Sequence, residues 1–262
     1  MIPRGYIDAW REHAPWRSDA MVEQDLIICR SLAAVFSHPE LSRLLAFRGG
    51  TALHKLFFHP PRRYSEDIDL VQLDPQPIGA VFNAVREALG PLLGEPQRKQ
   101  GPGVVTLTYR MQSETPPVVP LRIKIEINTR EHFTVFGVNR VPFSMVSPWW
   151  SGTCDAPTYT LEELLGTKMR ALYQRRKGRD LFDLWLGLTE GHAAPDKILT
   201  CFRKYMEHSG LRVTRRDFLD NLADKRSHPL FTADLSDLLP SDTAFDNQTG
   251  LDLVERVLVS QL

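Results

Sequence analysis

The sequence has little cysteine and no long apolar segment. Three cysteines, Cys29, Cys154 and Cys201, lie far apart and show neither CxxC nor Cys/His spacing, which argues against a disulfide framework and a structural zinc site. No stretch approaches the roughly 18 apolar residues of a membrane-spanning helix, and the start MIPRGYIDAWREHAPW has no apolar segment behind its charges. We therefore expect a cytoplasmic protein without a membrane partner.

Net charge is absent as well. The 262 residues include 32 Lys and Arg and 32 Asp and Glu, so no global positive field indicates a nucleic-acid partner, and such binding would need a local basic patch. With 42% hydrophobic and 24% charged residues, the composition is that of an ordinary globular protein. Function must be sought in local motifs.

The first half of the chain has the pattern of a mixed α/β unit. Apolar spacing predicts helices over 18–37 and from 78 to Gly90 and Pro91, and a short helix that begins at Gly49 and Gly50. Alternating or β-branched runs predict strands over 67–73, 103–111 and 120–130.

The second half has helical patterns only. They cover 161–176, 181–189, 196–208, 215–225 and 249–260. We predict an α+β protein in which a mixed sheet flanked by helices (residues 1–155) precedes a helical domain (residues 156–262).

Two strands carry acidic residues at alternating positions. In EDIDL, Asp67 and Asp69 project from one face of a strand while Ile68 and Leu70 project from the other. LRIKIEIN alternates in the same way and places Glu126 on its polar face. If the two strands are neighbours, Glu126 can join the two aspartates.

Three converging carboxylates cannot all stay ionised without a cation. Oxygen-only ligands favour Mg²⁺ or Mn²⁺, which makes Asp67, Asp69 and Glu126 candidate metal ligands. The alternative is a solvated sheet face whose acids pair with the nearby basic residues Arg62, Arg63 or Lys124.

The segment RGGTALHKL precedes the acids. Gly49 and Gly50 permit a close approach of the backbone to a ligand, and the first amides of the following helix, with the Thr51 hydroxyl, can form an anion site. The alternative is a glycine turn capped by Thr51. A Walker loop is excluded because no GK[ST] completes it.

GGTAL.K followed by R.SEDIDL resembles the AbiEii/AbiGii (MenT-type) toxin family of the polymerase-beta-like nucleotidyltransferase superfamily. Gly49, Gly50, Thr51, Lys55, Arg63, Ser65 and the acidic pair Asp67 and Asp69 occur in family order. The resemblance implies nucleotide binding by the first six residues, and metal-dependent catalysis at the aspartates with an NTP as substrate.

The segment TYTLEELLGTKMRALYQRRKGRDLFDLWLGL extends the resemblance. Thr160 and Glu163 have the spacing of a capping box, and Lys168 lies within an apolar stripe. Lys168 could extend to the surface, or its ammonium could meet phosphates or an acid. Asp180 could be a catalytic group or a helix N-cap, and Asp183 reads as a supporting core residue. The resemblance assigns Lys168 and Asp180 to the active-site cleft, and Lys168 also to nucleotide binding.

A basic run between them is most often a solvated helix end, but it is also a candidate RNA contact; it contains Arg170, Arg175, Arg176, Lys177 and Arg179. The resemblance implies a toxin of a bacterial type IV toxin-antitoxin system. It would transfer a nucleoside monophosphate from an NTP to RNA, foremost the 3′ acceptor end of tRNA, block translation, and be neutralised by a cognate antitoxin encoded nearby. The rivals are transfer to a protein or small-molecule hydroxyl, and a nucleotide sensor without activity.

Overall fold

The computed structural model describes residues 2–262, which form two compact units. The first unit contains the chain up to Phe133 and Val138–Tyr159, and the second contains Thr134–Gly137 and Thr160–Leu262. The first unit thus extends past residue 155, because its last strand runs to Thr158. The chain has the mixed architecture that the sequence predicts.

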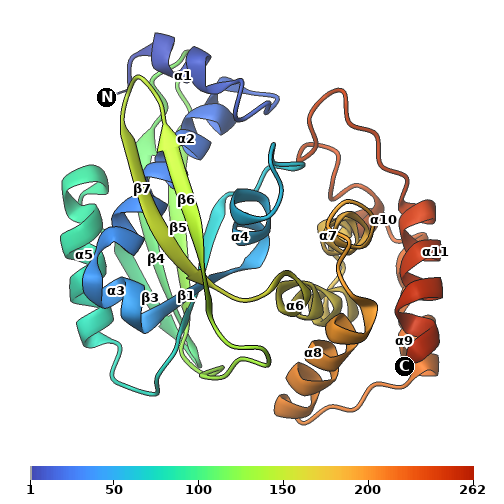
Figure 1. Ribbon diagram of the computed structural model, residues 1–262. Coiled ribbons are helices and arrows are strands. Elements are labelled where there is room, and N and C mark those ends of the chain that lie inside the picture. Colours follow the sequence, from blue (N-terminus) through green and yellow to red (C-terminus); the bar gives the residue numbers. More distant parts are fainter. Residues whose placement is uncertain (1) are drawn as a thin grey trace. The chain divides into compact units, whose positions relative to one another are not determined.

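The first unit is built on a seven-stranded mixed sheet with the order β3-β4-β5-β2-β1-β7-β6 (Figure 1). The strands are β1 (Leu45–Arg48), β2 (Asp67–Gln72), β3 (Gln97–Gly101), β4 (Val104–Gln112), β5 (Pro120–Asn128), β6 (Asn139–Val146) and β7 (Ser151–Thr158). β2 occupies the centre, antiparallel to β1 and parallel to β5. The two acid-bearing strands predicted from the sequence are therefore neighbours.

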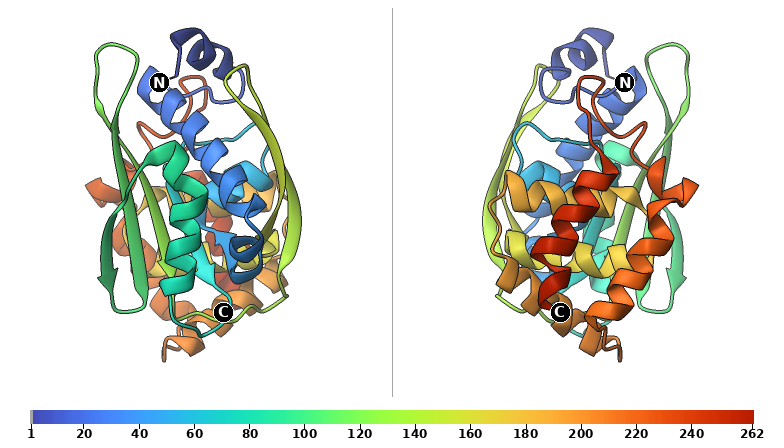
Figure 2. Two further views of the ribbon diagram at one scale, coloured as in Figure 1. Left: turned by 90° about the vertical axis from the view of Figure 1, so that its left-hand side faces the viewer. Right: turned by 90° about the vertical axis from the view of Figure 1, so that its right-hand side faces the viewer.

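Helices of the first unit cover the two faces of the sheet unequally. They are α1 (Arg4–Trp10), α2 (Asp19–Ser37), α3 (Pro39–Leu44), α4 (Gly49–Leu56) and α5 (Gly79–Leu93). α2, α3 and α5 lie on one face, whereas α4 lies on the other (Figures 1 and 2). Ile68, Ile123 and Ile125 are fully buried. Since side chains alternate along a strand, the acidic positions project from the opposite face.

Several elements of this unit were not predicted. β6 and β7 form an antiparallel hairpin that contains Pro142 and Pro157, and proline normally lowers the expectation of a strand. β3 is entirely polar apart from its final glycine. The predicted end of α5 at Gly90 and Pro91 is wrong, because the helix continues to Leu93.

The second unit is helical, in agreement with the sequence pattern. Its elements are α6 (Leu161–Gln174), α7 (Gly178–Thr189), α8 (Pro195–His208), α9 (Arg215–Arg226), α10 (Pro229–Thr232), α11 (Asn247–Val257) and the 3₁₀ turn η1 (Val259–Gln261). α6 packs against α7, α8 and α9, and α11 packs against α7 and α9 (Figure 2). No helix within residues 2–262 is long and apolar enough to cross a membrane.

Glu163 organises the start of α6. Thr160 Oγ1 accepts a hydrogen bond from Glu163 N (3.2 Å), so the predicted N-cap is present. The Glu163 carboxylate instead accepts from Thr134 Oγ1 and from the amides of Val135 and Phe136, all within 3.0 Å. Tyr205 donates a fourth hydrogen bond to it. The carboxylate thereby anchors the four-residue segment Thr134–Gly137 within the helical unit.

Lys225 closes the other end of α6. This buried lysine donates to the carbonyl oxygens of Leu172 and Tyr173 and to Asn221 Oδ1. The last carbonyls of a helix lack partners within the helix, so the ammonium satisfies them. Burial, together with the positive charge of Arg176, lowers the pKa of Lys225 to about 8.

Candidate functional site

Four charged residues project from the face of the sheet on which α4 lies. The parallel register of β2 and β5 places Asp67 opposite Lys124 and Asp69 opposite Glu126. Residues opposite each other in a register project to the same face. The structure therefore brings Asp67, Asp69 and Glu126 to one face, as the alternation along each strand predicts.

Lys124 lies between two of these acids. Its Nζ is 3.1 Å from Asp67 Oδ2 and 3.2 Å from Glu126 Oε1. Burial disfavours the charged ammonium, but the two carboxylates outweigh burial and raise the pKa of Lys124. Lys124 consequently stays protonated and supplies part of the positive charge that the acids require.

The carboxylate of Asp69 lies against Gly49, at the beginning of α4. Gly49 has φ of +80°, and a Cβ at this position would overlap Asp69 Oδ2. Both the left-handed conformation and the close approach require glycine here. The group that approaches the glycine turn in the structure is a carboxylate of this chain, and the approach of a ligand to this turn stays a prediction.

Gly50 makes a second close approach. A Cβ on Gly50 would overlap Arg63 Nη2 and lie 2.9 Å from Ser65 Oγ. Arg63 is buried, and its Nη1 donates to the carbonyl of Tyr64 (2.9 Å). The glycine pair therefore packs against a carboxylate on one side and a guanidinium on the other.

Thr51 joins α4 to β2. Its Oγ1 lies 2.9 Å from Ser65 Oγ and donates to the carbonyl of Asp67. The side chain is fully buried. The alternative of Thr51 as a helix cap is wrong, because the N-cap position is Arg48 and no side chain caps α4. Gly49, Gly50, Thr51, Arg63 and Ser65 form one group beside the acids.

The donor set on this face suits a hard divalent cation. Asp67 Oδ1 is buried and has no hydrogen-bond partner within residues 2–262, and an unpaired buried carboxylate oxygen is costly unless a cation meets it. Asp69 and Glu126 add further oxygen donors, which Mg²⁺ and Mn²⁺ prefer. As the side chains lie in the structure, no three His, Cys, Asp or Glu residues within 2–262 are grouped so that they could hold a metal ion. The Lys124 ammonium contacts both Asp67 and Glu126.

Lys55 does not join this group. It is buried, and its Nζ lies 2.6 Å from Asp25 Oδ2 on α2. Trp10 Nε1 and Trp16 Nε1 donate to the two oxygens of the same carboxylate at 2.9 and 3.0 Å. The structure thus directs this ammonium into the interior, whereas the family resemblance implies a phosphate contact.

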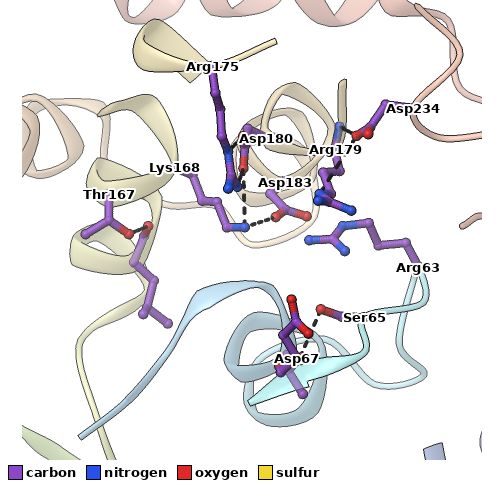
Figure 3. Close-up of polar contacts among 12 residues, drawn as sticks. Arg63, Ser65, Asp67, Thr167, Lys168, Arg175, Arg179, Asp180, Asp183 and Asp234 are labelled. Atoms are coloured by element: carbon purple, nitrogen blue, oxygen red, sulfur yellow. Dashed lines mark hydrogen bonds and ion pairs between the residues drawn. The ribbon is translucent and has the colours of Figure 1, made fainter. Parts of the chain in front are cut away.

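The helical unit contains a second cluster of charges. Lys168 Nζ lies 2.8 Å from Asp183 Oδ2 and 3.5 Å from Asp180 Oδ1 (Figure 3). Both aspartates are fully buried, and Lys168 is 6% exposed. Arg175 holds Asp180 in a bidentate contact with N···O distances of 2.7 and 2.8 Å. Two cations thus balance two buried anions.

This cluster decides between several alternatives. The possibility that Lys168 extends to the surface is wrong, because its ammonium is buried against acids. The N-cap role for Asp180 is also wrong, because α7 begins at Gly178 with Lys177 as its N-cap. Asp180 and Asp183 project from one side of α7, since residues three apart lie on the same helix face.

The basic run is mostly engaged inside the helical unit. The Arg170 guanidinium lies 4.9 Å from the Tyr205 ring centroid, and Arg175 is held by Asp180. Lys177 Nζ lies 3.3 Å from Asp234, and Arg179 donates its backbone N–H to the same carboxylate. Arg176 is exposed.

Comparison with known proteins bears on both units. Residues 30–250 match the family of nucleotidyl transferase AbiEii toxins of type IV toxin-antitoxin systems. The chain belongs to the AbiEii toxin family. No curated protein matches the chain.

Two solved structures share the fold of this AbiEii protein. MenT4, a nucleotidyltransferase toxin from Mycobacterium tuberculosis H37Rv, is 16% identical with a TM-score of 0.66, over 100% of this chain and 91% of that one. A protein from H. pylori assigned as a nucleotidyltransferase is 17% identical with a TM-score of 0.53, over 94% and 99% of the two chains. Family and fold together support a nucleotidyltransferase of the toxin class.

Sequence reasoning missed how three charged residues of this AbiEii protein are paired. Lys124 appeared only among possible partners of the acids, yet it bridges two of them. The bidentate contact of Arg175 with Asp180 spans five residues across a helix junction. Asp25 pairs with Lys55 and lies on α2 among buried residues. In the sequence, only this position within an amphipathic helix sets it apart from other acidic residues. None of these pairings has a local sequence signal.

Proposed function

We propose that this AbiEii protein transfers a nucleoside monophosphate from an NTP to RNA, foremost to the 3′ acceptor end of tRNA, and thereby blocks translation. The observation that supports it is the placement of Asp67, Asp69 and Glu126 on one sheet face beside the Gly49–Gly50 turn. We further propose that the protein acts in the cytoplasm and is neutralised by a cognate antitoxin.

In this proposal Asp67, Asp69 and Glu126 hold Mg²⁺ or Mn²⁺. When bound, the metal supplies positive charge for the triphosphate and lowers the pKa of the acceptor hydroxyl. The unpartnered Asp67 Oδ1 supports a cation at these acids, and the Lys124 ammonium beside Asp67 and Glu126 is the positive charge with which the metal would compete. The reaction forms a bond from the acceptor oxygen to the α-phosphorus and releases pyrophosphate.

The triphosphate would be bound by the group around the glycine turn. Residues at the start of a helix offer backbone N–H groups and a positive dipole end to an anion. Arg63 places a guanidinium against Gly50, and Ser65 adds a hydroxyl. We assign Gly49, Gly50, Thr51, Arg63 and Ser65 to nucleotide binding, and the Lys55–Asp25 ion pair to stabilising the sheet unit.

Lys168 and Asp180 complete the proposed catalytic set, and Lys168 is also proposed to bind the nucleotide. Their assignment rests on the family resemblance and on the burial of three charges, Lys168, Asp180 and Asp183, in one cluster. Desolvation of such charges opposes folding, and clusters of this kind are found more often at functional sites. In the helical unit, the basic run from Arg170 to Arg179 remains a proposed RNA contact, and Arg175 and Arg176 are its exposed members.

Labelled nucleotides test the proposal directly. The protein is incubated with Mg²⁺, total tRNA and each α-³²P-labelled NTP in turn, beside an Asp67→Ala, Asp69→Ala double variant. We expect label on RNA with at least one NTP and none with the variant. Absence of label on RNA with all four NTPs contradicts the proposal, and label on protein would instead indicate protein modification.

A further inference from the structure

The acidic face of the sheet continues outward into a basic and hydroxyl-rich surface. Beyond β2, the strands β5, β4 and β3 expose their polar sides there, because the opposite sides carry buried residues such as Leu107 and Tyr109. The register places Thr106 opposite Glu126, Thr108 opposite Lys124 and Lys99 opposite Thr106. We call the surface formed by Gln97, Lys99, Thr106, Thr108, Arg110 and Arg122 the open sheet face.

Two arginines oppose each other on this face. Arg110 of β4 is the direct cross-strand partner of Arg122 of β5, and both are exposed. Like charges directly opposite in a sheet destabilise it. Glu66 approaches Arg122 only to 3.8 Å, with both side chains about half exposed, so it offsets little of the repulsion. An anion lying across both strands would relieve it.

We propose that the open sheet face binds the phosphodiester backbone of the acceptor RNA. The proposal rests on the function proposed above and identifies the surface along which the acceptor strand reaches the acids of β2. Arg110, Arg122 and Lys99 provide the positive charges, and the hydroxyls of Thr106 and Thr108 provide donors to phosphate oxygens.

The dimensions of the sheet suit a short stretch of backbone. Neighbouring strands lie about 4.8 Å apart, so β3 lies three spacings, or about 14 Å, from β2 in the order β3-β4-β5-β2. An RNA strand that crosses from β3 toward β2 would meet the arginine pair before its end reaches Asp67 and Asp69. The positive charges thus precede the acids along one continuous face.

The composition of the face favours nucleic acid over a protein partner. A protein interface needs an apolar core, whereas all six residues that define the open sheet face are polar. Phosphate recognition depends on arginine, lysine and hydroxyl groups. The face offers these groups, and the register adds the half-buried Val104 at the start of β4 as an apolar neighbour.

Binding measurements on the full chain test this surface. A fluorescently labelled 12-nucleotide RNA of mixed sequence is titrated in EDTA without NTP, so that no transfer occurs, at several salt concentrations. For an Arg110→Gln, Arg122→Gln double variant we expect about tenfold weaker binding at low salt. The slope of log K against log salt should become shallower by about 1.4, since each phosphate contact on a single strand contributes about 0.7.

An Arg86→Gln, Arg98→Gln double variant is the charge-matched control. Both guanidinium groups lie near the Phe82 ring of α5, at 5.7 and 4.9 Å, on the helix-covered side of the sheet. This control should bind RNA as the wild type does, and thermal melts should confirm that both variants fold. Equal losses in the two variants would show that only net charge matters and would overturn the proposal.

Further outcomes decide between the alternatives. An unchanged salt slope in the Arg110 and Arg122 variant, or no RNA binding by the wild type, would refute the assigned surface. Tighter, arginine-dependent binding of a poly-glutamate peptide than of RNA would assign the face to an acidic protein. If RNA binding depends on both arginines but no NTP labels RNA in the transfer assay, the surface stands and the proposed reaction fails.

Discussion

The carboxylate of Asp69 lies against the α-carbon of Gly49, where any side chain would overlap it. This contact links the first turn of α4 to the second aspartate of β2. The glycine turn and the acidic strand are therefore one structural element, and a change in either displaces the other.

We expect Gly49→Ala to destabilise the sheet unit and to abolish nucleotide transfer. The left-handed backbone of a non-glycine residue alone costs about 1 to 2 kcal/mol, and displacement of Asp69 adds to it. Gly79→Ala is the control, because a Cβ there meets nothing within 4 Å and the helical position favours alanine. Urea unfolding of both variants measures the difference, and equal stability would contradict the contact.

Lys124→Gln should strengthen the binding of Mn²⁺. The ammonium lies 3.1 Å from Asp67 and 3.2 Å from Glu126, so it competes with a metal for the same oxygens. At this partly buried site, loss of one positive charge at this range is worth about 1 kcal/mol or more, which is about fivefold or more in affinity. Electron paramagnetic resonance of free Mn²⁺ measures binding, with Asp67→Asn as the variant that should lose it.

Lys168→Met should destabilise the helical unit by about 3 kcal/mol, because it removes the ammonium that pairs with the buried Asp183 carboxylate, whereas Asp180 keeps its contact with Arg175. Lys204→Met is a matched control whose ammonium pairs with Glu207 on the exposed surface of α8. Exposed pairs contribute at most about 1 kcal/mol. Adding Asp183→Asn to Lys168→Met should restore part of the loss, and a purely additive double variant would show that the two residues do not interact.

The stability of the protein should rise with pH through the titration of Lys225. Its pKa is about 8 in the folded chain and 10.5 in the unfolded chain, so between these values the unfolded state binds more protons and the free energy of unfolding increases. The expected increase is about 2 to 3 kcal/mol. Lys225→Met should lack this increase, and parallel stability curves for both proteins from pH 8 to pH 10.5 would refute it.

Lys55→Met should lower stability without changing the KM for NTP of the folded protein. The substitution leaves the buried Asp25 carboxylate without its ammonium partner, at a cost of about 3 kcal/mol. Trp10 and Trp16 both donate to Asp25, so their fluorescence reports the change. A raised KM in the folded variant would return Lys55 to the nucleotide site.

The sequence predicts best where local periodicity decides the structure. Strict alternation in 120–130 locates β5 and the polar face that bears Glu126, and the helices of the second unit agree closely with their apolar spacing. The hairpin of β6 and β7 escapes prediction because its strands contain proline and alternate weakly, and only long-range pairing stabilises them.

Pairing of charges is harder to predict because it depends on neighbours that are distant in sequence. Alternation places Lys124 on the correct face, but only the register with β2 brings it to Asp67. Asp180 follows a glycine and resembles a helix cap, yet the helix begins two residues earlier and the carboxylate turns inward to Lys168 and Arg175. Local rules do not contain these contacts.

Glu163 binds Thr134, Val135 and Phe136, which the chain contributes to the helical unit before β6 begins. The helical unit is therefore discontinuous in the gene. A truncated protein that starts at Thr160 would leave a buried carboxylate stripped of three donors, and recombination at a single point could not transplant this unit intact into another protein.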